Sequence, residues 1–353
     1  MIRGIVGAAR ALFGPRGRGK LGGSRGPAAG GSRMAGRLIG LAVLVALVGL
    51  GLSVYARFFH VPALAQTPQH RDDGAPLPEA DEFEHLAKTD PIAMYDKCLA
   101  RYQREVRGGF ITRLLKRERV KGEPPPPAEL PEEVIRLAVR GDLPDPETGK
   151  RAVEVSMKWE SGARKFLGSE IRATLYSEKP GAEGTGSRVV TWRPDASFSA
   201  RSAAPINGPL AEGQSRYCIR DAGLYGAMLR TYTAWKQRRE AGTLKFEYLG
   251  KRAVEKAGGR VCHVIKRTCA GLEVDAFELG GKPDLSPGNV EKSGFTSVTV
   301  MIDAERWLQV GSELERTGPD GKSVLIASYY FRDIELNPTF PPDAFTEAGM
   351  KSK

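Results

Sequence analysis

Residues 298–340 read VTVMIDAERWLQVGSELERTGPDGKSVLIASYYFRDIELNPTF, and apolar and polar side chains alternate along most of this stretch. Two polar turns interrupt the alternation. A period of two residues is typical of half-buried strands, so the stretch predicts an antiparallel meander with strands at 297–303, 307–314 and 323–336. The last strand is apolar on both of its faces between Val324 and Phe331. We therefore expect a sheet that is covered on both sides.

The chain before this meander alternates between helical and strand patterns. Apolar residues recur at helical spacing in two segments, 91–106 and 221–240, and Asp90-Pro91 supplies an N-cap residue followed by a first-turn proline. Strand-like runs occupy 134–140, 153–159, 170–177, 188–192, 244–254 and 259–268. The run 134–140 also fits the start of a helix. Two helices with roughly eight to ten strands predict an α+β domain, a curved antiparallel sheet that wraps one or two helices.

The positive charge of the chain is concentrated at its N-terminus. The net charge is +11, but residues 1–65 hold nine Lys and Arg residues and no acid, which leaves +2 for the remainder. A nucleic-acid-binding domain needs its basic patch on the folded part. We therefore expect no nucleic-acid partner.

A continuous apolar segment follows the basic tail. Residues 38–56, LIGLAVLVALVGLGLSVYA, are uncharged and long enough to cross a hydrocarbon core of roughly 30 Å as a helix. Basic residues precede the segment, so the positive-inside bias places the C-terminal part outside the cytoplasm. The favoured interpretation is a single-pass anchor in the cytoplasmic membrane; the alternative is a signal peptide cleaved after Ala65, which leaves a periplasmic protein. Met1 and Met34 are both acceptable starts.

These patterns divide the chain into five regions. Residues 1–37 are expected to form a disordered basic cytoplasmic tail and 38–56 the membrane or signal segment. Residues 57–89, rich in Pro and acidic residues, predict an extended tether. The α+β domain occupies 90–347, and 348–353 form a short tail.

The order of elements resembles a known family of folds. An N-terminal helix, antiparallel strands, a helical insertion and a final meander ending in DIELNPTF are similar to the half-open barrel of bacterial lipoprotein carriers and their periplasmic sensor relatives (LolA-, LolB- and RseB-like). Short stretches within this order, YDKCLARY at 95–102, MKW at 157–159 and GRVC at 259–262, resemble the uncharacterised bacterial envelope family called domain of unknown function 1571. The similarity covers about Pro91 to Phe345. It implies an extracytoplasmic location and an apolar concavity for lipid or acyl chains, and supplies no catalytic residues.

Two sets of side chains are candidates for a site. Aromatic residues on a concave sheet would line a ligand cavity; they are Trp159, Tyr176, Trp192, Trp307 and Tyr329. Disulfides are permitted outside the cytoplasm, and the cysteines are Cys98, Cys218, Cys262 and Cys269. Cys262 and Cys269 lie about 23 Å apart if one strand contains both, so a bond between them requires the chain to reverse direction. Cys262-His263 has too few close ligands for a metal site.

No hydrolase or phosphate-loop signature occurs in the exported part, so we expect neither catalysis nor a metal or other cofactor. The leading hypothesis is a non-catalytic domain that binds a lipid, a lipoprotein acyl chain or another apolar ligand. The alternative is a structural or sensory module that docks another envelope protein through its surface. An empty apolar concavity would favour the first hypothesis, and a filled core with an exposed apolar patch would favour the second.

Overall fold

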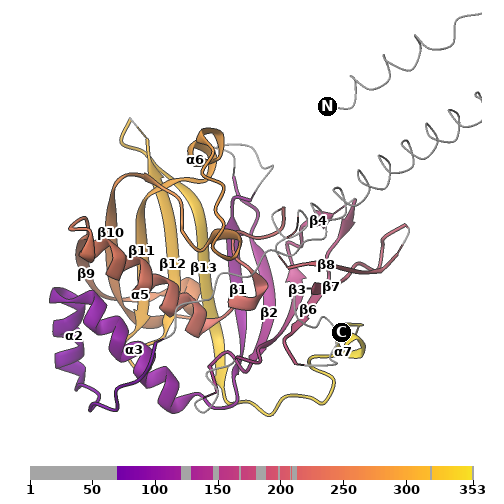
Figure 1. The fold of residues 1–353 in the computed structure, drawn as a ribbon, viewed down its shortest axis with the longest axis horizontal. Coiled ribbons are helices and arrows are strands. Elements are labelled where there is room, and N and C mark those ends of the chain that lie inside the picture. The colour runs from indigo at the N-terminus through magenta and orange to yellow at the C-terminus, as the bar shows by residue number, and fades with distance from the viewer. Residues whose placement is uncertain are drawn as a thin grey trace, which may run out of the picture. The chain divides into compact units, whose positions relative to one another are not determined.

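An open antiparallel sheet of eleven strands dominates the part of the chain that the structure describes (Figure 1). The structure is a computed structural model and describes residues 70–120, 129–145, 151–166, 168–179, 188–197, 199–206, 208, 213–318 and 320–351. The compact unit to which these residues belong runs from Phe59 to Lys353. The expected α+β class with a large antiparallel sheet is confirmed.

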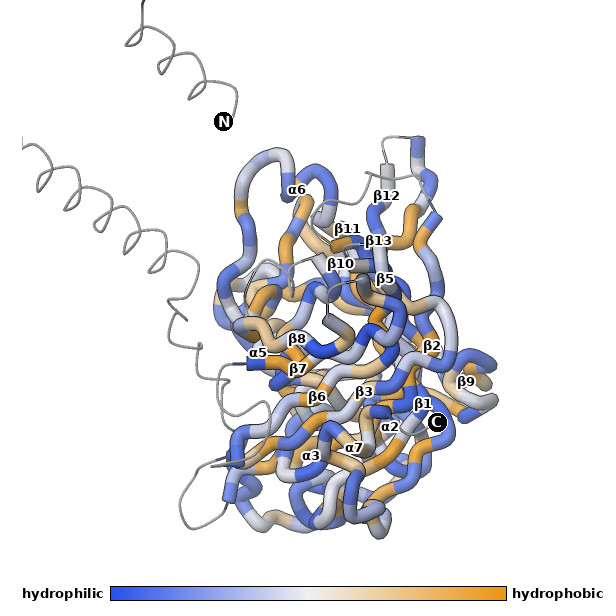
Figure 2. The backbone as a smooth tube through the Cα atoms, turned by 90° about the vertical axis from the view of Figure 1, so that its right-hand side faces the viewer, coloured by the Kyte–Doolittle hydropathy of each residue, from blue (hydrophilic) through white to orange (hydrophobic). Residues whose placement is uncertain are grey.

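The sheet strands follow the chain in two runs. The first run is β1 (Phe110–Glu118), β2 (Glu133–Arg140), β3 (Glu154–Ser161), β6 (Ala173–Ser177), β7 (Arg188–Trp192) and β8 (Arg201–Pro205). The second is β9 (Lys245–Val254), β10 (Arg260–Glu273), β11 (Phe295–Asp303), β12 (Gln309–Thr317) and β13 (Ser323–Leu336). β4 (Lys165–Phe166) and β5 (Ser169–Glu170) form a separate small ribbon. Along many strands hydrophobic and hydrophilic residues alternate (Figure 2).

The strand order explains why a helix lies across the sheet. The order is β8-β7-β6-β3-β2-β1-β13-β12-β11-β10-β9, so the chain builds outward from β1 to one edge and then begins again at the other. Helix α5 (Leu224–Glu240) joins β8 to β9, the two edge strands. The second run returns to the centre, where β13 pairs with β1. A helix that connects opposite edges must cross one face of the sheet, and α5 does so (Figure 1).

The face beneath α5 is concave. Residues from ten of the eleven described sheet strands, all except β9, line a single cavity together with α5. A flat sheet of eleven strands would be roughly 48 Å wide at a strand spacing of about 4.8 Å, too wide for its two ends to border one cavity. The sheet must therefore curl around α5.

Two N-terminal helices extend the helical layer that α5 begins. In α3 (Pro91–Glu105), the Asp90 side chain accepts hydrogen bonds from the Ile92 and Ala93 backbone N–H groups, as its N-cap position predicts. Part of the expected tether 57–89 is also helical: α2 (Ala80–Thr89) buries Phe83 and Ala87. Helical spacing of its apolar residues, together with the packing partner that the sheet provides, stabilises this segment.

The C-terminal segment covers part of the opposite face. Ala173, Leu175 and Val190 from β6 and β7 pack against Phe345 and Met350, the latter in helix α7 (Glu347–Lys351). The remaining described helices are α6 (Pro287–Ser293) and the 3-10 turns η1 (Ile219–Asp221), η2 (Glu255–Ala257) and η3 (Glu278–Gly280). Consecutive buried residues from Ile326 to Ser328 confirm that β13 is covered on both faces.

The structure contains strands that the sequence did not predict. Strands β1 and β8 were not predicted, and β1 lies at the centre of the sheet, where charged residues in its sequence are paired with other buried charges. The open choice at 134–140 is resolved in favour of a strand. Among the described residues no helix has the length and apolarity needed to cross a membrane. The segment 38–56 and the cleavage position Ala65 lie outside the described residues.

Candidate functional site

A cavity of about 220 Å³ lies between the concave face of the sheet and helix α5. Its walls are mainly apolar. The sheet contributes Leu114, Ile135, Met157, Val189, Val298, Leu314 and Phe331, and the helix contributes Ala227, Ala234 and Trp235. These side chains come from strands that are distant in sequence, and the curl of the sheet brings them around one volume.

Two of the five predicted aromatic residues line this cavity. They are Trp159 on β3 and Tyr329 on β13. The Trp159 indole Nε1 donates a 2.7 Å hydrogen bond to Glu133, and the Tyr329 hydroxyl donates a 2.6 Å hydrogen bond to Glu118. Both rings therefore present apolar surface to the cavity while a carboxylate holds their polar atom.

The other three aromatic residues lie elsewhere. Tyr176 is buried in the core, with its hydroxyl directed to Glu178. Trp192 packs on the opposite face, because Thr191, its neighbour on β7, is the residue that lines the cavity and adjacent strand residues point to opposite faces. Trp307 has a positive φ of 58° in the turn before β12 and stacks on Phe83 of α2, with ring centroids 4.2 Å apart. These three residues therefore lie outside the lining of this cavity, and a role for them in ligand binding stays a prediction.

A buried charged cluster forms the wall beside Trp159 and Tyr329. Lys116 Nζ lies 2.8 Å from Glu118 Oε1 and 3.2 Å from Glu133 Oε1, and Arg164 Nε donates to Glu133 over 2.9 Å. Burial opposes ionisation of Glu118, but Lys116 and the Tyr329 hydrogen bond lower its pKa overall. Burial likewise opposes the charge of Lys116, but the two carboxylates raise its pKa overall. These charges therefore balance one another.

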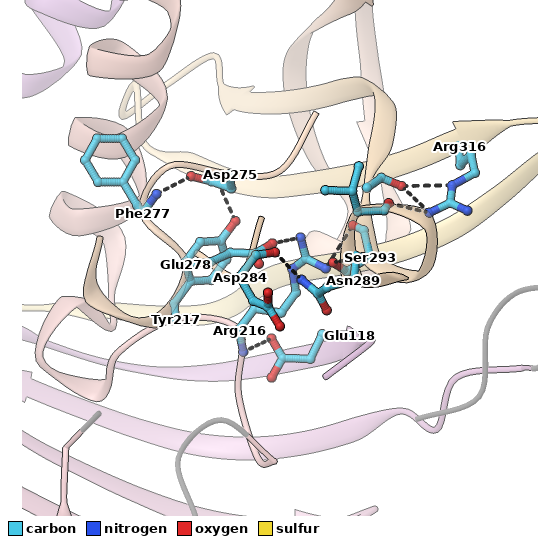
Figure 3. A network of polar contacts seen from close by, with 12 residues as sticks. Glu118, Arg216, Tyr217, Asp275, Phe277, Glu278, Asp284, Asn289, Ser293 and Arg316 are labelled. Carbon is cyan, nitrogen blue, oxygen red and sulfur yellow. Dashed lines mark hydrogen bonds and ion pairs between the residues drawn. The ribbon is translucent and has the colours of Figure 1, made fainter. Parts of the chain in front are cut away.

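A second set of paired charges holds the loop between β10 and β11 (Figure 3). The buried Arg216 pairs with Glu278 of η3 and donates to the Ser293 backbone carbonyl at the end of α6. Its own backbone N–H donates to Glu118, which links this loop to the first cluster. Tyr217 donates to Asp275, and both line the cavity. The loop thus closes one end of the cavity through contacts with residues 216–217.

Ionic groups elsewhere in the lining are also paired. Both terminal nitrogens of Arg267 donate to Glu273 Oε2 over 2.9 Å, and Arg238 lies 3.2 Å from the same atom. Arg230 donates to the Asp221 backbone carbonyl and lies over the Tyr217 ring, but it forms no ion pair with a described carboxylate. The charged lining groups thus have partners within the protein, although Arg230 has only neutral ones.

All four cysteines are free thiols. Cys262 and Cys269 both lie on the extended strand β10, which keeps them too far apart to pair, as their spacing predicted. Cys218 lines the cavity, and burial, followed by the nearby Asp221 charge, raises its thiol pKa to about 12. The thiol is therefore protonated at neutral pH, which makes it a poor nucleophile.

His263 is buried on β10 beside Phe83, and its Nδ1 lies 3.0 Å from the Tyr248 hydroxyl. The described part of the chain contains no group of three His, Cys, Asp or Glu side chains placed to hold a metal ion.

Position on the sheet, rather than residue type, separates the cavity lining from the core. The sequence did not indicate Ala234 of α5 or Gln309 of β12 as lining residues, and neither residue had a local signal.

Comparison with known proteins gives weak similarities. No protein-family model and no curated protein matches the chain; membership of the domain of unknown function 1571 family therefore stays a prediction. Among solved structures, a LolA superfamily protein from Nitrosomonas europaea aligns over 72% of this chain and 98% of its own at 9% identity, with a TM-score of 0.28. A β-barrel-like protein of domain of unknown function 1849 from Brucella abortus aligns over 67% and 100% at 10% identity, with a TM-score of 0.15. We base the functional inference on the cavity itself.

Proposed function

We propose that this chain is a non-catalytic binding protein that holds a lipid, a lipoprotein acyl chain or another apolar ligand between its curved sheet and helix α5. The observation that carries the proposal is the mainly apolar cavity of about 220 Å³, in which Lys116 and Arg267 of the lining are already bound by carboxylates of the protein. Apolar walls favour transfer of hydrocarbon from water in proportion to the area buried. A charged ligand would instead have to displace existing ion pairs.

The absence of catalysis is part of the proposal and has its own support. The Cys218 thiol in the lining is kept protonated by burial. Glu118 is already bound by Lys116 and Tyr329, so it has no free position from which to act as a general base.

We also propose that the domain works outside the cytoplasm, anchored through 38–56 or released after Ala65, and that it belongs to the envelope family that it resembles. Protease added to intact spheroplasts should then degrade residues 66–353. Protection of this region from the protease would contradict the location.

The test of binding begins with the full chain, purified from a bacterial envelope, extracted with organic solvent and analysed by mass spectrometry for bound lipid. A stoichiometric lipid is expected. In Ala234→Phe a ring from α5 enters the cavity and should reduce the bound lipid severalfold, whereas Lys236→Phe places the same ring on the exposed side of the same helix and should not.

Two results would contradict binding in the cavity. One is the absence of lipid even after incubation with envelope lipids, which would favour the alternative docking module. The other is an equal loss of lipid in both variants, which would place the lipid outside the cavity.

A further inference from the structure

One polar side chain in the cavity has a donor group without a partner. Gln309 lines the cavity and is only 3% exposed. The buried Tyr95 hydroxyl of α3 donates a 2.7 Å hydrogen bond to its Oε1 atom, and the Thr231 hydroxyl of α5 lies 3.0 Å from the same atom. The Thr231 hydroxyl has a single proton and also lies 3.1 Å from the Ala227 carbonyl oxygen, so the Tyr95 hydroxyl is the donor that holds the amide oxygen toward the helices.

The amide nitrogen of Gln309, Nε2, is the other polar atom of this side chain. No described residue accepts a hydrogen bond from Nε2, and this nitrogen is not among the fully buried side-chain atoms that lack a partner, so it stays accessible from the cavity. Since Oε1 faces the two helices, Nε2 is the atom that the amide offers to the cavity.

A β-bulge gives Gln309 this position. In the pairing of β11 with β12, Met301 faces Gly311 and Ile302 faces Gln309, so Val310 has no partner. Gln309 and Ser312 both line the cavity although they are three residues apart, which a regular strand would place on opposite faces. Bulges redirect side chains in this way and are frequent next to binding sites.

We propose that Gln309 Nε2 donates a hydrogen bond to a carbonyl oxygen of the bound ligand, so the cavity selects an acyl ester or amide over a plain hydrocarbon chain. This inference rests on the proposed function and narrows its ligand class. The surrounding walls hold the chain, and the amide holds the one polar atom that an acyl group carries into an apolar volume.

The test compares the methyl ester of a saturated fatty acid with the alkane of matched chain length. Their affinities for the full chain are measured in a fluorinated surfactant, which mixes poorly with hydrocarbon, by displacement of a fluorescent apolar dye. Tyr95→Phe serves as the reference variant because it removes the buried tyrosine hydroxyl and leaves the Gln309 amide. The test variant adds Gln309→Met, which removes both partners of the hydrogen bond together and so avoids stranding either one.

The ratio of ester affinity to alkane affinity should fall about three- to tenfold from the reference to the test variant. The hydration of each probe is the same in both experiments, so it cancels from this comparison. Isotope-edited infrared spectra should also show the bound ester carbonyl at a hydrogen-bonded frequency in the unmodified chain, a readout that needs no variant.

Several results would overturn the subsite. An unchanged ratio with a free carbonyl frequency does so, as does a ratio that responds instead to Thr174→Val or Thr191→Val on the far wall of the cavity. These outcomes leave apolar binding intact, whereas failure of both probes to bind would overturn the proposed function as well. Displacement of the ester by diacylglycerol or by an acylated lipopeptide supports the subsite and identifies the source of the carbonyl. If neither competitor displaces the ester, the subsite is overturned.

Discussion

Replacement of Lys116 by methionine should destabilise the domain strongly. The Lys116 ammonium is buried between Glu118 and Glu133, whose side chains are 0% and 1% exposed. Glu133 keeps Arg164 and Trp159 as partners after the substitution. Glu118 keeps only neutral hydrogen-bond donors among its described contacts, with the Arg164 and Arg216 charges acting on it at longer range, so it becomes the carboxylate without a direct ion pair.

The magnitude follows from this geometry. Removal of one partner of a buried ion pair costs about 3–5 kcal/mol, because the remaining charge is left in a medium of low polarity. For a domain of this size that loss lowers the unfolding temperature by about 10 °C. The double variant Lys116→Met with Glu118→Gln should recover most of it, since a neutral amide no longer requires a countercharge.

Urea unfolding followed by tryptophan fluorescence, at several pH values, measures these effects. Glu118 has a lowered pKa in the unmodified chain, so its contribution is present above its model-peptide value of 4.5 and is lost as the pH falls below that value. In the single variant, burial dominates and the carboxyl binds a proton more readily. The difference between the two proteins should therefore be largest near neutral pH and should narrow toward pH 4.5. A loss below about 1 kcal/mol, or a double variant no more stable than the single one, would show that Glu118 does not depend on Lys116 for its charge.

Three further predictions concern the frame that holds the cavity. Asn337→Ala should cost about 1–2 kcal/mol in unfolding free energy, because Oδ1 accepts from the Arg107 and Gly108 N–H groups and Nδ2 donates to the Glu105 carbonyl, all at an exposed position. Asn337→Asp, which keeps the acceptor, should cost less than half of that in the same urea titration. Gly109→Ala should abolish folding or cost more than about 3 kcal/mol by thermal unfolding, since a Cβ there would lie 2.1 Å from the Val139 carbonyl oxygen, whereas Gly250→Ala, also at positive φ but in open space, should cost about 1–2 kcal/mol. Burial, followed by the Lys251 charge, lowers the pKa of His263 to about 4. The contribution of neutral His263 to the free energy of unfolding is therefore present above pH 6.5, and about 3 kcal/mol of it is lost as the pH falls to 4. If unfolding of His263→Gln shows the same pH-dependence, this assignment is contradicted.

Local pattern was sufficient for most of the secondary structure. The alternation in 298–340 and the capping residues around Asp90 depend on interactions within a few residues, so they can be read from the sequence. Strand β1 was missed for a physical reason: its residues FITRLLKRE include Lys116 and Glu118, which are acceptable in a central strand because they pair with each other and because β2 and β13 supply Glu133 and Tyr329 as partners. Helix α2 was missed because the adjoining segment is rich in proline and charge and its packing partner is remote in sequence.

The cavity lining depends on contacts between distant segments even more than the secondary structure does. Sequence alone was sufficient to predict an α+β domain with an antiparallel sheet, a helix inserted between two groups of strands and apolar faces on both sides of the last strand, because period and polarity act locally. It could not assign Trp192 and Trp159 to opposite faces of the sheet, and it could not identify Gln309 as part of the lining. Strand register, curl and a single bulge decide these placements, and each depends on pairing between segments far apart in the chain. The cavity is thus a product of tertiary structure alone.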